Sequence, residues 1–79
     1  MNKFIFANGH FYDTLKFDNF YVDKNADNSY SIYMSRNGLS RRYELKNYKN
    51  KQKAFSDLKE LMLYIADGNI YDVDYKREI

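Results

Sequence analysis

The 79-residue chain contains no cysteine, no proline and no tryptophan, and it has only three glycines and one histidine. Without cysteine the chain cannot build a disulfide scaffold, an iron–sulfur cluster, a thiolate zinc site or a cysteine nucleophile. The scarcity of proline and glycine argues against a linker or a low-complexity segment. No apolar run approaches the roughly 18 residues that a membrane-spanning helix needs, so we expect no membrane partner.

Aromatic residues are abundant in this chain. Nine tyrosines and six phenylalanines make 19% of the sequence aromatic, while 44% is hydrophobic and 30% is charged. This length and composition predict a single globular domain over residues 1–79 with one small core. The apolar stretch that follows Met1 is shorter than the hydrophobic region of a secretory signal, so we expect a cytoplasmic protein.

Several segments show the alternation of apolar and polar residues that predicts β-strands. An Asn-Gly pair at 8–9 favours the positive φ angles of a tight hairpin turn between two short strands. Segments 17–22, 29–35 and 40–46 also alternate, and the last two flank a second Asn-Gly turn at 37–38. These three segments are expected to form an antiparallel meander.

The apolar spacing changes to that of a helix after Asn50. It predicts one amphipathic helix over residues 51–67, with Asn50 as the N-cap and Gly68 just beyond the C-terminal end. We expect its packed face to consist of Phe55, Leu58, Leu61, Met62 and Ile65, and its other faces to carry Lys53, Asp57, Lys59 and Glu60. Alternation at 71–75 indicates a last strand.

Together these elements predict an α+β fold, in which the helix packs on one face of an antiparallel sheet of about four to six short strands. The strand residues expected to face the helix are Phe20, Val22, Tyr30, Ile32, Met34, Tyr43 and Leu45. The alternate residues face outward, where no second helix is expected to cover them. Tyr21, Tyr33 and Arg42 are the candidate partner-binding residues on this face, because Tyr and Arg are enriched at the centres of protein interfaces. A homo-oligomer that pairs this face with itself is a further expectation.

Catalytic and metal chemistry have few candidates in this sequence. His10 follows the first hairpin turn and is expected to be exposed, and no serine lies in a G-x-S-x-G or S-x-x-K motif at a plausible site. Asp23, Asn25 and Asp27 match the first ligands of a calcium loop, but Asn28 and Met34 stand where Gly and the closing Glu are needed. We therefore expect no enzyme activity, no metal site and no cofactor.

Positive charge is concentrated in residues 36–53, which hold seven basic residues and one acidic residue although the net charge of the chain is only +2. Basic side chains interleaved with tyrosines suit phosphate contacts combined with base stacking. Nucleic-acid binding is therefore the alternative hypothesis. Its candidate residues are Arg36, Arg41, Arg42, Lys46 and Lys49.

The residue usage, which is rich in Lys, Asn, Tyr, Phe and Ile, favours a gene from an AT-rich bacterium or its mobile elements. Together with the small size and the lack of a catalytic set, it resembles small phage and mobile-element proteins, including anti-CRISPR proteins. The resemblance lies in size and composition, and no sequence motif carries it. It implies a non-enzymatic protein-binding module that inhibits a host enzyme or defence complex by steric block.

Overall fold

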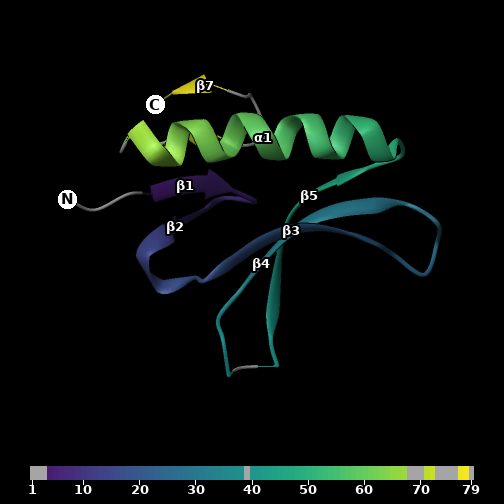
Figure 1. Cartoon of the computed structure of the whole chain (residues 1–79), viewed down its shortest axis with the longest axis horizontal. Helices are drawn as coiled ribbons and strands as arrows, with labels where there is room; N and C mark the ends of the chain where they lie inside the picture. Colours follow the sequence, from purple (N-terminus) through teal and green to yellow (C-terminus); the bar gives the residue numbers. More distant parts are fainter. Residues whose placement is uncertain (1–3, 39, 68–70, 73–76, 79) are drawn as a thin grey trace.

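The computed structural model of the chain describes residues 4–38, 40–67, 71–72 and 77–78. It is an α+β fold in which one helix packs against β-strands, which confirms the predicted class (Figure 1). The elements are β1 (Phe4–Ala7), β2 (His10–Asp13), a 3-10 turn η1 (Thr14–Lys16), β3 (Asn19–Lys24), β4 (Tyr30–Ser35), β5 (Arg42–Tyr48), α1 (Lys51–Asp67), β6 (Tyr71–Asp72) and β7 (Arg77–Glu78).

The strands are divided between two sheets, whereas the sequence pattern indicated one. β3, β4 and β5 form the expected antiparallel meander in that order. The second sheet has the order β2-β1-β6-β7, and in it β1 and β6 are parallel. Pairing between strands more than sixty residues apart has no local sequence signal, which is why alternation alone did not separate the sheets. Of the predicted last strand, only Tyr71 and Asp72 lie within the described residues.

The first hairpin turn is confirmed, and it also has a tertiary role. Asn8 and Gly9 both adopt positive φ angles, 54° and 77°, as a tight hairpin turn requires. The side-chain amide of Asn8 donates to the backbone oxygens of Glu44, at 3.0 Å, and Leu45, at 3.5 Å. The β4–β5 register shifts at this point, so that Leu45 is an extra residue in β5. Asn8 thus joins the hairpin to an interruption in the strand ladder.

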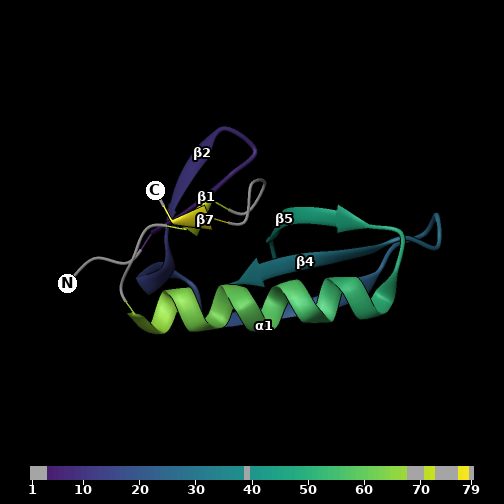
Figure 2. The same ribbon diagram turned by 90° about the horizontal axis from the view of Figure 1, so that it is seen from above.

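The helix begins where the sequence predicts. The side-chain oxygen of Asn50 accepts a hydrogen bond from the Lys53 N–H at 3.1 Å, which confirms the N-cap. The predicted C-terminal residue Gly68 lies outside the described residues. Figures 1 and 2 show α1 lying along the meander, with β1 and β2 near its C-terminal half.

Most of the predicted packed face of α1 is confirmed, since Leu61 is buried and Leu58, Met62 and Ile65 pack against the core. Ala54 and Leu61 are fully or almost fully buried, and Asp57, expected on another face, is only 5% exposed. Lys53 Nζ lies 3.3 Å from Asp57 Oδ1. Phe55, expected to pack, is 41% exposed. It lies at the margin of the helix face, where it lines a depression with other side chains of the β3–α1 boundary.

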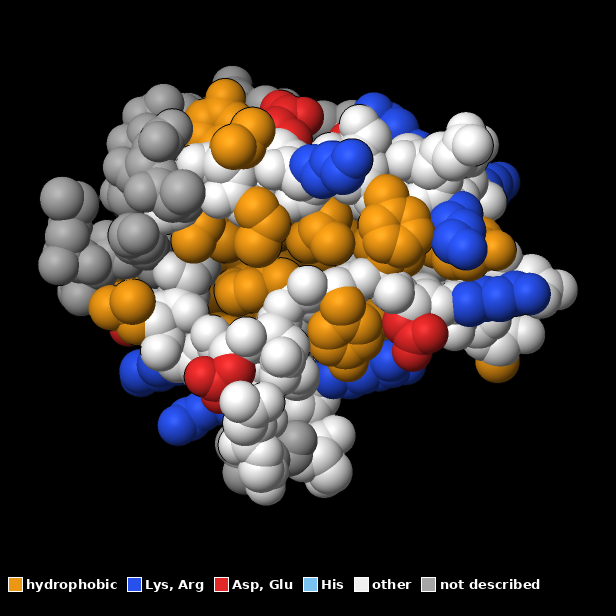
Figure 3. All heavy atoms as spheres, in the orientation of Figure 1, with side chains coloured by type: hydrophobic (Ala, Val, Ile, Leu, Met, Phe, Trp, Pro, Cys, Tyr) orange, Lys and Arg blue, Asp and Glu red, His pale blue; other side chains and the backbone are white. Residues whose placement is uncertain are grey.

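The core lies between α1 and the two sheets. Ile5 and Ala7 of β1 join Ile32, Met34 and Leu45 of the meander in one buried cluster. The other strand residues predicted to face the helix, Phe20, Val22, Tyr30 and Tyr43, pack against this cluster and are partly buried. The space-filling view shows hydrophobic side chains in a row along the boundary between α1 and the strands (Figure 3). The predicted orientation of the meander is therefore confirmed.

Candidate functional site

The outer face of the meander, defined here as the side of β3–β4–β5 opposite α1, brings the three predicted partner-binding residues together. Tyr21 and Tyr33 are cross-strand partners whose ring centroids lie 6.0 Å apart. The guanidinium carbon of Arg42 lies 3.8 Å from the centroid of the Tyr33 ring. No described element covers this face. The predicted juxtaposition of Tyr21, Tyr33 and Arg42 is therefore present, while their role in binding stays a prediction.

The sequence predicts Tyr33 as an accessible residue on the outer face. In the structure its side chain is not freely exposed there. It is only 8% exposed, with the Arg42 side chain over its ring and the Tyr21 ring beside it. Its hydroxyl group donates a short hydrogen bond to the side-chain oxygen of Asn25. Tyr33 is therefore a support for the residues above it, and Tyr21 and Arg42 are the members of the trio that a partner would reach.

Hydrogen bonds between side chains order the rest of the outer face. Asn25 Nδ2 donates to the hydroxyl groups of Ser29, at 3.0 Å, and Ser31, at 2.8 Å. Asn47 Nδ2 donates to the same two hydroxyl groups, at 2.8 Å and 3.0 Å. Ser31 Oγ, which is fully buried, donates to Glu44 Oε2 at 2.6 Å. A network that connects the β3–β4 turn to β4 and β5 holds the polar groups of this face in one arrangement.

Charge on the outer face is paired. Arg42 Nη1 lies 2.8 Å from Asp23 Oδ2, and this hydrogen bond is the main reason that the pKa of the Asp23 carboxyl is lowered. The same bond, followed by a contribution from the Tyr21 hydroxyl, raises the pKa of Arg42. Asp27 has a lowered pKa because it accepts hydrogen bonds from the hydroxyl group and the backbone N–H of Ser29. The carboxylates of the rejected calcium loop are thus engaged with different partners.

The candidate nucleic-acid residues do not form one surface. Arg42 faces outward, whereas the guanidinium carbon of its neighbour Arg41 lies 4.9 Å from the centroid of the Tyr43 ring on the opposite side. Lys46 lies beside Tyr48, with Nζ 5.7 Å from the ring centroid, and Lys49 is exposed beyond the end of β5. Only Arg36 and Arg41 of the five predicted cations meet at a common site.

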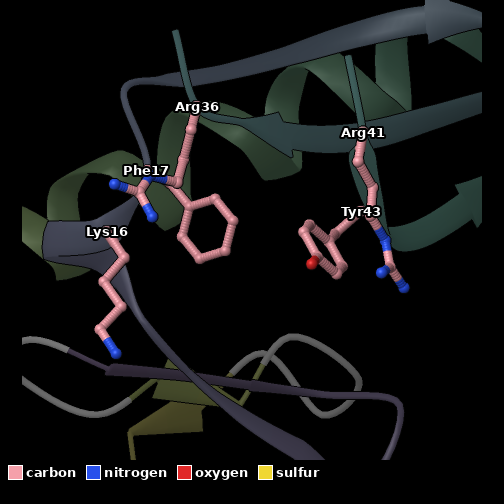
Figure 4. A pocket seen from close by; sticks show the side chains of 5 residues that line it. All are labelled: Lys16, Phe17, Arg36, Arg41 and Tyr43. Carbon is pink, nitrogen blue, oxygen red and sulfur yellow. The ribbon is translucent and has the colours of Figure 1, made fainter. Parts of the chain in front are cut away.

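That common site is a hollow of about 220 Å³ lined by Lys16, Phe17, Arg36, Arg41 and Tyr43, which we call the basic–aromatic hollow. The rings of Phe17 and Tyr43 meet edge to face at 5.5 Å, and Tyr12 lies 6.0 Å from Tyr43. In Figure 4 the two rings lie between the side chains of Lys16 and Arg36 on one side and that of Arg41 on the other. No acidic residue lines the hollow.

Lys16 and Phe17 were not among the predicted site residues. They precede the meander, and their approach to Arg36, Arg41 and Tyr43 comes from the packing of Phe17 and Tyr12 against Tyr43. The one local signal is the succession of a cation and an aromatic residue at 16–17. Such pairs are too common to identify a site without the tertiary contact.

The structure offers little that resembles a catalytic centre. His10 is exposed at the start of β2, as predicted, and its ring lies 6.2 Å from that of Tyr12. Within the ranges that the structure describes, no group of three or more His, Asp or Glu side chains is arranged to hold a metal ion. No helix in the described part of the chain is long and apolar enough to cross a membrane.

Comparison with known proteins gives no match: no family model, no curated protein sequence and no solved structure is significantly similar to this chain. Function is therefore inferred from the outer face and the basic–aromatic hollow.

Proposed function

We propose that the chain is a non-enzymatic protein-binding module whose outer face contacts a partner protein through Tyr21 and Arg42. The observation that carries the proposal is the position of Arg42, which stacks on Tyr33, pairs with Asp23 and lies beside Tyr21 on a face that no described element covers. Tyr and Arg in such settings are the side chains that most often supply binding energy at protein interfaces.

The charge pattern favours a protein over a nucleic acid as the partner of this face. Arg42 is the one cation among the outer-face residues described above, and its charge is balanced by Asp23, while Glu44 accepts from Ser31. A surface for a polyanion would need an excess of free cations. Mixed charge with amide and hydroxyl groups suits a partner surface that itself offers hydrogen-bond donors and acceptors.

Pre-ordering of the face also supports binding. Side chains that are free in the unbound protein lose rotamer freedom on association, at about 0.5–1.5 kcal/mol for each immobilised side chain. The network through Asn25, Ser31 and Asn47, and the stacked position of Arg42, restrict these side chains before a partner arrives. Less of the interaction energy is then spent on ordering.

The biological role that we attach to this binding is inhibition of a host enzyme or defence complex by steric block, as anti-CRISPR proteins do. The support for it is the small size of the chain, its AT-biased composition and its small number of candidate catalytic groups. A rigid face that binds without chemistry acts by occupying the surface that a substrate or a subunit needs.

Affinity capture tests the proposal when it is made dependent on the outer face. The tagged wild-type chain and a Tyr21→Ala, Arg42→Ala variant are incubated with nuclease-treated lysate of the cells from which the gene comes. Bound proteins are then quantified by mass spectrometry. A protein that the wild type retains and the variant loses is the expected result.

The matched control is Phe11→Ala, which removes a 59% exposed ring from the other sheet and should retain the partner. Thermal melting of each variant shows that the fold is kept. Proteins that are retained equally by the wild type and the outer-face variant would contradict the proposal, and so would a preparation in which nothing is retained.

A further inference from the structure

We propose that the basic–aromatic hollow is a second binding site, separate from the outer face, and that its ligand is a segment of single-stranded nucleic acid. In this site Lys16, Arg36 and Arg41 contact phosphates, and a base stacks on the accessible part of the Tyr43 ring. The Phe17 ring stands at 82° to Tyr43, so one base does not stack on both. The proposal does not depend on the protein-binding role of the outer face, because it uses none of the same side chains.

Uncompensated positive charge is the first observation behind this proposal. Three cations line the hollow without an acidic side chain among its lining residues. Within the described residues, none of the three is in an ion pair, in contrast to Arg42, which is held by Asp23. Arg36 and Arg41 each carry a planar guanidinium group that matches the geometry of phosphate oxygens. The hollow therefore favours an anionic ligand.

The aromatic wall is the second observation. Phe17 and Tyr43 are partly buried, so each ring packs against its neighbours while part of it remains accessible from the hollow. Aromatic side chains in a basic groove are the common feature of proteins that bind single strands, since every base has a face that stacks. A binding site for phosphate alone has no need of two rings.

The arrangement of the cations favours a nucleic-acid strand over a compact anion as the ligand. A single phosphate or a phosphorylated side chain is best held by cations that converge on one point. In Figure 4 the cationic side chains lie on both sides of the ring pair, with Lys16 and Arg36 towards Phe17 and Arg41 beyond Tyr43. An extended backbone that passes across the rings would place successive phosphates near both groups of cations.

The size of the hollow agrees with this ligand. Its volume of about 220 Å³ is below the roughly 300–1,000 Å³ of pockets that enclose a drug-sized molecule. It accommodates one base or one phosphate group, with the rest of the ligand outside. A duplex keeps its bases stacked and paired inside, so it cannot place one on these rings, whereas a single strand can.

Fluorescence anisotropy with a labelled oligothymidylate of about ten nucleotides measures this binding directly. Three phosphate contacts on a single strand predict a slope of log K against log salt of about −2. The Lys16→Ala, Arg36→Ala, Arg41→Ala variant should bind about ten-fold or more weakly at about 50 mM salt and should lose most of the slope. Unlabelled duplex DNA and a phosphoserine peptide, added as competitors, should displace the probe far less well than the unlabelled strand.

Charge-matched and shape-matched controls complete the experiment. Lys24→Ala, Lys49→Ala, Lys59→Ala removes three exposed cations outside the hollow and should keep near-wild-type affinity. Tyr43→Leu should weaken binding by about five-fold or more through the loss of stacking, while Tyr43→Phe should not. All variants are first shown to melt cooperatively.

Four results would overturn the proposal. They are the absence of binding by the wild type, equal loss in the two triple variants, wild-type affinity of Tyr43→Leu, and displacement by the duplex or the phosphopeptide as effective as that by the single strand. The last result would assign the hollow to the competitor that displaces the probe. None of them bears on capture of a protein by the outer face.

Discussion

Arg41 and Arg42 are consecutive in the chain, but their guanidinium groups lie on opposite faces of the meander. Arg41 lies over Tyr43, next to the hollow, with a separation of 4.9 Å from the guanidinium carbon to the ring centroid. Arg42 lies over Tyr33 on the outer face at 3.8 Å. Arg41 directly precedes β5, and because successive residues of an extended segment point to opposite sides, the two adjacent arginines lie on two different surfaces. The basic segment of the sequence is therefore divided between them.

The packed face of α1 predicts a contrast between two leucines of the helix. Leu61 is 1% exposed and Leu63 is 68% exposed. Leu61→Asp places a carboxylate in the hydrophobic core of the described residues at a cost of several kcal/mol, comparable with the roughly 3–5 kcal/mol that a domain of this size possesses. We expect circular dichroism to show an unfolded chain. Leu63→Asp should change stability by less than about 0.5 kcal/mol, and equal effects of the two substitutions would mean that the buried face is wrongly placed.

Burial of Tyr33 predicts that its removal destabilises the fold. Tyr33→Ala should cost about 2–4 kcal/mol, because the ring is 8% exposed and supports Arg42. Tyr33→Phe, which leaves the side-chain oxygen of Asn25 without its donor, should cost about 1 kcal/mol. Tyr21→Ala, at a half-buried position, should cost less than Tyr33→Ala. Urea unfolding compares the three, and a Tyr33→Ala variant as stable as Tyr21→Ala would disprove the supporting role.

The Asp23–Arg42 pair predicts a specific titration. The pKa of the Asp23 carboxyl is lowered in the folded state. The stabilisation from Asp23 is therefore present above the ordinary carboxyl pKa and is lost as pH falls through the folded-state pKa. In Arg42→Ala the pKa of Asp23 should rise towards its ordinary value, although the Lys24 N–H continues to lower it. Carboxyl ¹³C shifts measured against pH give the midpoint. Arg41→Ala is the control and should leave it unchanged, whereas an unchanged midpoint in Arg42→Ala would show that the pair does not form in solution.

The two roles of Asn8 are separable by substitution. Asn8→Gly keeps the positive φ angle of the turn and removes only the amide that donates to Glu44 and Leu45. We expect a loss of about 1 kcal/mol in the free energy of unfolding. Asn8→Ala also introduces backbone strain and should cost about 1 kcal/mol more. Thermal unfolding would contradict this account if the alanine variant were as stable as the glycine variant.

Features with a local cause were predictable from the sequence. The helix over 51–67 follows from the spacing of its apolar residues and the Asn50 cap, and both are contained in one short segment. The turn at Asn8-Gly9 and the orientation of the meander likewise depend on neighbouring residues. These elements could be predicted because local preference and tertiary packing agree.

Features that depend on contacts between distant segments were not predictable. The burial of Asp57 and Ala54 depends on how α1 lies against the strands, which an apolar stripe does not reveal. The burial of Tyr33 depends on the path of the Arg42 side chain, and the hollow depends on the contact between Phe17 and Tyr43. The parity of the strands predicted which residues share a face, but not which of them cover the others.

The central claim, that the outer face and the basic–aromatic hollow are independent binding surfaces, is tested most directly by the two adjacent arginines. The dissociation constants of Arg41→Ala and Arg42→Ala are measured for the captured partner protein and for the oligothymidylate. The account predicts that Arg42→Ala weakens the protein complex by about thirty-fold, equivalent to about 2 kcal/mol, and spares the oligonucleotide. Arg41→Ala should weaken only the oligonucleotide complex. If both substitutions weaken the same ligand to the same extent, the two surfaces are one, and the claim is wrong.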